Sequence, residues 1–214
     1  YNTDLANNLG NLVSRTHAMT VKYFGGVVPV PAAEEGPDGE LKAAVRNCVE
    51  KYTALMDGFR LADAADEIFS LLRRANKYID ETMPWALAKD ESRRERLGSV
   101  LYNLLETIRT AAVLLTPFIP ETAGKIFAQL NTDLSALETV SAFGAYRPGT
   151  VLGAAAPLFA RVDEKVVAEI IKAREEAAAK AEKAAAIPEK PEGCAVIGID
   201  DFMKVELRSA KVLA

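Results

Sequence analysis

Apolar side chains recur every three or four residues through most of the first 130 positions, and glycine or proline interrupts this pattern at each break. In the opening block, the inward stripe contains Leu5, Leu9, Leu12, Thr16, Met19 and Tyr23. This spacing is typical of one face of an α-helix, and Gly25-Gly26 marks its end. Because such faces are buried against one another, the pattern predicts an all-α protein.

The same periodicity predicts four more helices, after a loop that runs from Val27 to Gly39. A second helix ends at Gly58, and a third covers Leu61 to Thr82. A fifth begins at Pro120, since proline suits the first turn of a helix. We expect the five helices to pack around one core.

Prolines define the fourth helix and the turn before it. Pro84 interrupts the third helical pattern and leaves a short turn over residues 85–89. The fourth helix begins near Glu91 or Ser92. It ends at Thr116, because the residue before Pro117 disfavours the helical backbone.

The pattern divides the chain into four segments. Residues 1–130 form the helical domain, and 131–162 are an irregular segment rich in glycine and proline. Residues 163–192 are rich in Ala, Glu and Lys, which predicts a solvated linker helix. In the last segment, 193–214, the apolar period changes and the run from Val205 to Val212 is a candidate strand.

Charge and composition restrict the possible functions. The 214-residue chain has a net charge of −4, so it lacks the general basic character of a protein that binds nucleic acid by electrostatics alone. The well-separated Cys48 and Cys194 favour a reducing cytosol over a disulfide framework. His17 is the only histidine, and we expect it at the surface with no chemical role.

No catalytic or membrane motif is present in the sequence. It contains no Gly-rich phosphate loop, no metal-ligand cluster, no Ser/His/Asp set and no apolar run of membrane-spanning length. The first residue, Tyr1, already lies within a helical pattern, so we interpret the chain as a fragment of a longer protein. We expect no catalysis by this fragment alone.

One group of residues has side chains that are chemically suited to binding an unpaired nucleic-acid base. Trp85 is the only tryptophan and directly follows Pro84. Asn11 and Arg15 lie four residues apart, at the edge of the packed face of the first helix. An indole can stack on a base while an amide and a guanidinium read its edge. The structural alternative is a buried tryptophan with a solvated polar face beside it.

Several ordered segments resemble bacterial-type methionyl-tRNA synthetase, a class I synthetase, in its C-terminal anticodon-binding region. They are Asp4–Arg15, Asn76–Ile79, Pro84–Lys89, Leu115–Ala123 and Pro157–Val162. Ile199–Arg208 is similar to the start of the OB-fold tRNA-binding domain that many members carry. Two residues depart from the family pattern: Ala160 replaces a usual proline and Ser209 a common valine.

The resemblance implies roles for four residues. Trp85 would stack on the first anticodon base, a cytosine, and Pro84 would fix the angle of the indole. Asn11 and Arg15 would contact that cytosine and its neighbour. A guanidinium donates to the acceptors O2 and N3 of cytosine, whereas uracil presents a donor at N3. Leaving a buried donor unpaired costs roughly 1–3 kcal/mol, which gives a physical basis for reading a CAU anticodon.

Basic residues on either side of Trp85 are candidate phosphate contacts: Arg73, Arg74, Lys77 and Lys89. The simpler interpretation of such clusters is a solvated helix surface, and Arg93, Arg94 and Arg96 form a second cluster of the same kind. For Asn76 we expect a buried amide that satisfies backbone groups near Pro84.

The resemblance also implies partners and cofactors. The partners are the anticodon loop of tRNA(Met) and the protein's own catalytic domain, with a homodimer only through a complete OB-fold domain and no membrane. The fragment itself needs no cofactor or metal; ATP, and zinc in some members, belong to the catalytic half. Two alternatives remain open: the equivalent domain of another class I synthetase, or a helical protein-interaction module.

Overall fold

The computed structural model describes residues 2–160, 164–184 and 198–204. The chain divides into two compact units, Tyr1–Val162 and Asp163–Ala214. The candidate strand from Val205 to Val212 lies outside the described residues.

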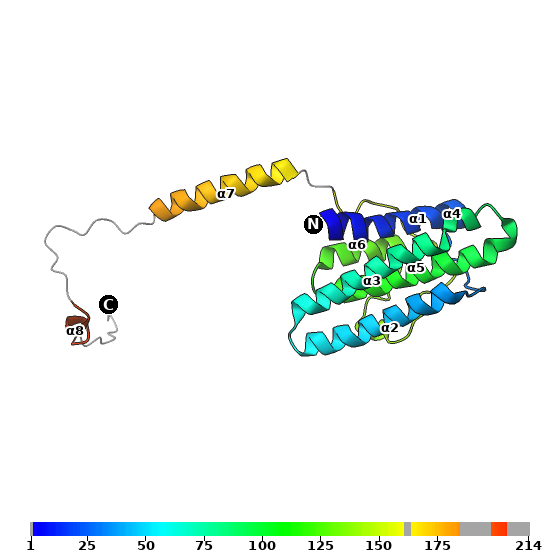
Figure 1. The fold of residues 1–214 in the computed structure, drawn as a ribbon, viewed down its shortest axis with the longest axis horizontal. Coiled ribbons are helices and arrows are strands. Elements are labelled where there is room, and N and C mark those ends of the chain that lie inside the picture. The colour runs from blue at the N-terminus through cyan, green and yellow to red at the C-terminus, as the bar shows by residue number, and fades with distance from the viewer. Residues whose placement is uncertain (1, 161–163, 185–197, 205–214) are drawn as a thin grey trace, which may run out of the picture. The chain divides into compact units, whose positions relative to one another are not determined.

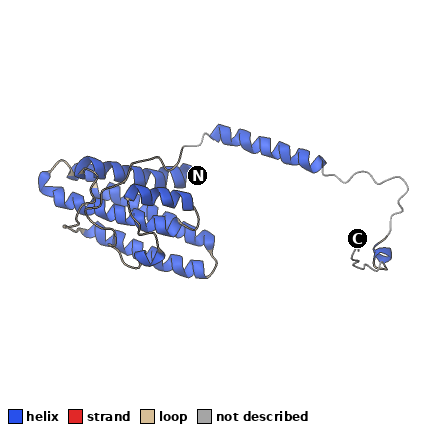
Figure 2. Ribbon diagram, turned by 180° about the vertical axis from the view of Figure 1, so that it is seen from behind, coloured by secondary structure: helices blue, strands red, loops and turns tan. Residues whose placement is uncertain are grey.

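The first unit is a helical bundle (Figure 1). A π-helix of nine residues precedes the first α-helix, and two 3₁₀ turns occur later. The elements are η1 Asn2–Gly10, α1 Asn11–Phe24, α2 Gly36–Asp57, α3 Leu61–Thr82, α4 Pro84–Leu87, η2 Glu91–Arg93, α5 Arg94–Leu115, α6 Pro120–Leu130 and η3 Leu137–Val140. Figure 2 shows helices and loops but no strand in the described part of the chain. The all-α prediction is confirmed, with α1, α2, α3, α5 and α6 as the five main helices.

Helix α5 is the centre of the bundle. All of its residues from Arg96 to Leu115 are buried, and it packs against α1, α2, α3 and α6. The apolar stripe of the opening helix supplies Leu9 and Leu12 to the same core. Burial on every side explains why α5 carries a wide apolar face.

The predicted loop before α2 is too long. The helix begins at Gly36, so residues 36–39 are helical and not part of the loop. Glu35 and Asp38 form a capping box in which each side chain accepts the other's backbone N–H, and Pro37 occupies the first turn. Proline and glycine commonly indicate a loop, but here they accompany a helix start.

The end of α5 is where the sequence predicts it, but for a different reason. Thr116 keeps helical dihedrals, φ −53° and ψ −42°, although Pro117 follows it. The hydrogen-bond ladder ends because proline has no N–H to donate. The steric effect on the preceding residue is therefore not what terminates this helix.

Two buried ion pairs tie the surrounding segments to α5. Arg96 donates to both carboxylate oxygens of Asp38, at 2.6 and 2.8 Å. Glu106 accepts from Arg109 at 2.8 Å and from the backbone N–H groups of residues 144–146. The second pair holds the irregular segment after α6 against the central helix.

His17 is buried, which corrects the expectation that it lies at the surface. Its Nε2 lies 2.9 Å from the carbonyl oxygen of Gly153. The segment around Gly153 also pairs with α6, because the N–H of Gly153 donates to the carbonyl of Gln129 at 2.9 Å. The irregular segment thus covers a face of α1 that the helical pattern alone leaves open.

The second unit contains α7, Glu164–Ala184, and α8, Ile199–Phe202. The apolar residues Val166, Ile170 and Ile171 of α7 are about half exposed. Among residues 2–160, 164–184 and 198–204, no helix is long and apolar enough to cross a membrane.

Candidate functional site

The junction between α3 and α4 presents the tryptophan to solvent. Met83 is the one residue between the two helices, with a left-handed backbone at φ 43° and ψ 64°. Its N–H donates to the carbonyl of Ile79 at 2.9 Å, which closes α3. Pro84 is buried at the first position of α4, and Trp85 follows it with 41 % of its surface exposed. The exposed indole is therefore attached to a helical turn whose first residue, Pro84, is buried.

The guanidinium of Arg15 lies beside the indole. The Cζ of Arg15, on α1, is 5.9 Å from the centroid of the Trp85 ring. This distance is within the range of a cation–π interaction. A carboxylate oxygen of Asp80 lies 4.0 Å from the same guanidinium. Both groups are partly exposed, so Arg15 retains donors that face water.

Asn11 lies one helical turn before Arg15 on α1 and is exposed. It lines a cavity of about 270 Å³ together with Ser14 and the segment from Pro157 to Phe159. The structure thus brings Arg15 and Trp85 together over the buried Pro84, whereas Asn11 lies at the neighbouring turn of the same helix.

The proposed phosphate contacts differ in how they are paired. Arg74 lies 3.0 Å from both Glu40 and Glu81, and Lys77 lies 3.5 Å from Glu81. Arg73 lies 3.9 Å from Asp4. Lys89 is exposed and makes no ion pair with any residue that the structure describes. Of the four cations, Lys89 is the most available to a phosphate.

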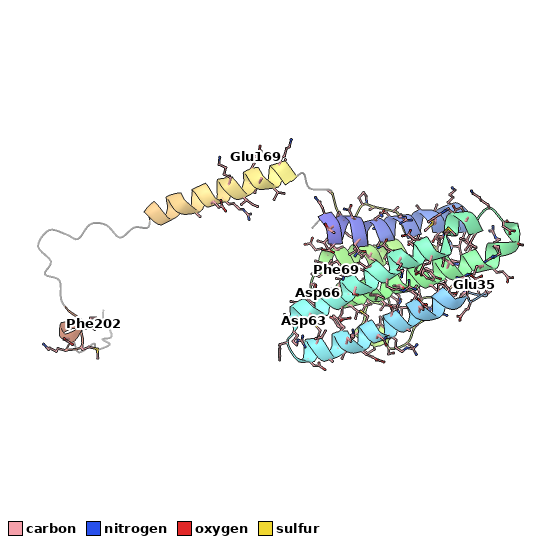
Figure 3. The ribbon with its side chains drawn as sticks, viewed as in Figure 1. Glu35, Asp63, Asp66, Phe69, Glu169 and Phe202 are labelled. Carbon is pink, nitrogen blue, oxygen red and sulfur yellow. The ribbon has the colours of Figure 1, made fainter. Side chains whose placement is uncertain are left out.

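The second basic cluster is not one solvated surface. Arg96 is only 3 % exposed and belongs to the core through Asp38. Arg93 pairs with Glu35 at 2.8 Å, and Arg94 lies over the ring of Phe24 at 5.1 Å. Acidic partners therefore neutralise much of the positive charge that the sequence places near Trp85. Figure 3 labels Glu35 at the start of α2, and Asp63 and Asp66 of α3 lie at the opposite end of the α2–α3 pair.

The expectation for Asn76 is wrong in its partner. Its amide donates to the side chain of Asn8 at 2.6 Å and to the backbone carbonyl of Asn8 at 3.3 Å. The carbonyl of Leu72 also accepts from it at 3.1 Å. Asn76 therefore ties α3 to the opening helix and not to the backbone near Pro84, because Asn8 lies opposite it across the helix contact.

A buried polar network supports α3 close to its end. The hydroxyl of Tyr78 donates to Asp38 at 2.5 Å, and the amide of Asn103 donates to that hydroxyl at 3.3 Å. Burial alone raises the pKa of Asp38, but hydrogen bonds from Arg96, Tyr78 and the backbone of Glu35 outweigh it, and its pKa falls below the usual value. Burial is also the main cause of the raised pKa of Tyr78. Asp38 is thus a buried carboxylate held in its charged form.

Sequence reasoning missed four residues, at the indole and in the buried network that supports α3. Asp80 has the spacing of an ordinary exposed helical residue, although the tertiary fold places it beside Arg15. Tyr78 and Asp38 are far apart in sequence, and the pattern carries no signal of their contact. Met83 carries one sequence signal, because Pro84 restricts the backbone of the residue before it, but that signal does not indicate a left-handed conformation.

A larger cavity of about 690 Å³ lies on the α1 face beside the residues that line Asn11's cavity, and most of its lining is apolar. Its lining includes His17, Val21, Gln129 and the segment from Gly153 to Pro157. In the described ranges, no three His, Cys, Asp or Glu side chains gather closely enough to hold a metal ion.

Fold and surface together define a class: an all-helical domain that displays an exposed aromatic–cation pair at a helix junction. A sequence profile described as "Anticodon binding domain of methionyl tRNA ligase" matches residues 28–178. The chain therefore belongs to the family of methionyl-tRNA ligase anticodon-binding domains.

Individual relatives agree with this assignment. The chain is 47 % identical to a methionine–tRNA ligase of Clostridium acetobutylicum over 213 residues, which cover 99 % of this chain and 32 % of the relative. It is 46 % identical to that of Caldanaerobacter subterraneus, with 99 % and 32 % covered. The apo crystal structure of Mycobacterium tuberculosis methionyl-tRNA synthetase has a TM-score of 0.71 at 34 % identity, over 76 % of this chain and 33 % of that one. The chain thus spans about a third of the length of the curated relatives it matches.

Proposed function

We propose that this chain recognises the CAU anticodon loop of methionine tRNA for a methionine–tRNA ligase. One observation carries the proposal: an indole that is 41 % exposed has a guanidinium 5.9 Å from its ring, and Asn11 lies one turn away on the same helix as that guanidinium. Base stacking on an aromatic ring gives affinity, and the two polar side chains supply hydrogen bonds to base edges.

In this proposal each residue has one role. Trp85 stacks on the first anticodon base, a cytosine, and the buried Pro84 holds the turn that carries the indole. Arg15 and Asn11 donate to that cytosine and its neighbour. Lys89 contacts a backbone phosphate, and the paired cations Arg73, Arg74 and Lys77 do so only when they exchange their carboxylate partners.

The intact ligase would attach methionine to tRNA in the cytoplasm with ATP, which acts in a catalytic domain outside this sequence. We propose no cofactor for the chain itself. Its partners are the anticodon loop and the catalytic domain. A homodimer would require a complete OB-fold domain, of which residues 193–214 are the beginning in this proposal. The domain bounds of 1–130, 131–162 and 163–192 stand as part of the same proposal.

The test uses the fluorescence of Trp85, because it is the sole tryptophan of the chain. The chain is titrated with a methionine-tRNA anticodon hairpin and, separately, with the same hairpin carrying U in place of the first anticodon C. We expect strong quenching by the C hairpin and weak quenching by the U hairpin. Equal binding of both hairpins without any change in fluorescence would remove the proposal.

Variants extend the test to individual roles. Trp85→Ala loses the stacking surface, so binding of a labelled C hairpin falls by about 1–3 kcal/mol. Phe59→Ala is the matched control, because Phe59 is 88 % exposed in the turn between α2 and α3, and its loss leaves binding unchanged. Arg15→Ala reduces the difference in binding affinity between the C hairpin and the U hairpin. A protein-interaction module predicts no effect of Trp85→Ala on RNA binding.

A further inference from the structure

Met83 is the single residue between α3 and the turn that carries Trp85. The N–H of Met83 donates to Ile79 at 2.9 Å and ends α3. The carbonyl of the same residue accepts from Ala86 at 2.8 Å and from Leu87 at 3.2 Å, which begins α4. One residue therefore ends one helix and starts the next, and the indole stands two positions beyond it.

Met83 is an unusual residue for this backbone conformation. Two other left-handed helix ends of the bundle carry Gly25 at φ 61° and Asn131 at φ 51°. A third, just after α2, carries Phe59 at φ 55° and shares the steric cost of Met83. Glycine and asparagine adopt this conformation with little steric cost, whereas a longer side chain does not. Pro84 restricts the backbone of Met83 further. The side chain of Met83 is 49 % exposed, so burial does not account for a methionine at this position.

A residue with a Cβ atom has only a small allowed range of left-handed φ and ψ angles, whereas glycine has a broad one. At Met83 this restriction limits how far α4 can rotate relative to α3. The backbone of α4 is thereby held where the ring of Trp85 lies 5.9 Å from the guanidinium of Arg15. Ordering a side chain during binding weakens affinity, so an indole ordered in advance binds more tightly.

We propose that Met83 is a positioning residue for base recognition: its strained left-handed backbone holds Trp85 in the stacking orientation in the free protein. This inference rests on the proposed function, in which Trp85 stacks on an RNA base. Backbone strain of this kind is stored where the surrounding structure over-determines it, and here two helix termini and the buried Pro84 do so.

The decisive variant is Met83→Gly. Glycine removes the steric strain and also the restriction, so we expect an unchanged melting temperature, within about 4 °C. Binding of the C hairpin should weaken by roughly 2- to 12-fold, the range that corresponds to ordering one side chain on binding. Met83→Asn keeps a Cβ in a residue that tolerates this conformation, and it should bind like the unmodified chain.

Phe59→Gly is the matched control. Phe59 also has a positive φ, 55°, and is 88 % exposed. It lies at the opposite end of α3 from Trp85, a distance of about 33 Å along a 22-residue helix. Relief of its strain should leave hairpin binding unchanged.

A readout in the free protein separates positioning from general stability. Time-resolved fluorescence anisotropy of Trp85 should show no fast local rotation in the unmodified chain and a clear fast component in Met83→Gly. Fast rotation in the unmodified chain would overturn the inference, even if no variant could be purified.

Two binding results would also overturn it: full affinity in Met83→Gly, or equal losses in Met83→Gly and Met83→Asn, since the latter would mean that the thioether itself contacts RNA. None of these outcomes touches the proposed function, which fails only if the unmodified chain shows no selective response to the C hairpin.

Discussion

Removal of Arg96 from the core should produce a stability loss that depends on pH. In the folded chain Arg96 is 3 % exposed and Asp38 is fully buried, and two charge-assisted hydrogen bonds of 2.6 and 2.8 Å join them. The substitution Arg96→Met leaves the carboxylate with only the hydroxyl of Tyr78 and the N–H of Glu35. Leaving one member of a buried pair uncompensated costs about 3–5 kcal/mol. The domain should still fold, because stabilities of 5–15 kcal/mol are typical.

The sign of the pH dependence follows from the pKa of Asp38. In the unmodified chain this pKa is lowered, so ionised Asp38 stabilises the folded state. That stabilisation is present above the unfolded pKa of 3.8 and is lost as the pH falls below it. Without Arg96, burial dominates and raises the pKa, so the variant gains stability as Asp38 takes up a proton. The difference in free energy of unfolding between the unmodified chain and Arg96→Met should therefore be smaller at about pH 4 than at about pH 7.

Urea unfolding followed by circular dichroism measures this difference at both pH values. The control is Arg93→Met, because Arg93 makes an exposed pair with Glu35 and should contribute only about 0–1 kcal/mol. A loss for Arg96→Met that is equal at both pH values would refute the reasoning, since the penalty would then not come from the charge of Asp38. A loss below about 1 kcal/mol at neutral pH would show that the carboxylate finds water when Arg96 is removed.

Three further predictions concern packing, reactivity and RNA contacts. Gly153→Ala should cost about 1–3 kcal/mol in thermal or urea unfolding, because its Cβ would lie 2.2 Å from the carbonyl oxygen of Ala128; Gly124→Ala, with open space around it, should instead be stabilising. Burial raises the pKa of Cys48 to about 12, so in a Cys194→Ser background the folded protein should react with a thiol reagent only as fast as it unfolds, and rapid labelling would contradict the buried position. Lys89→Ala should reduce the salt dependence of hairpin binding by about one counterion. Arg74→Ala removes a cation that is already paired, so it should change the salt dependence little. A larger change for Arg74→Ala than for Lys89→Ala would assign the phosphate contact to α3.

Most of the helical architecture could be predicted from local signals. Spacings of three and four residues identify the faces that pack on α5, and Gly25, Pro84 and Pro120 mark helix boundaries because each acts through its own backbone. The start of α2 was misplaced because Pro37 and its neighbouring glycines are ambiguous. They are read as a loop unless the reciprocal bonds of Glu35 and Asp38 are known.

The candidate site was predicted in its residue types more fully than in its geometry. Trp85, Arg15 and Asn11 follow from the sequence, partly through the family resemblance, and their role in RNA recognition stays a proposal. The partners of these residues did not follow. Asp80 beside Arg15, Asn8 beside Asn76, and the carboxylates that neutralise Arg74 all depend on which helices meet.

The sequence by itself determined the helices, their buried faces and the turn at Pro84, because periodicity, proline chemistry and glycine freedom act over a few neighbouring residues. The tertiary structure alone decided that His17 is covered by Gly153, that Arg96 is a core residue and that the indole meets a guanidinium from α1. The physical reason is range: burial and ion pairing depend on contacts between residues as many as 136 positions apart, and no local pattern encodes those contacts.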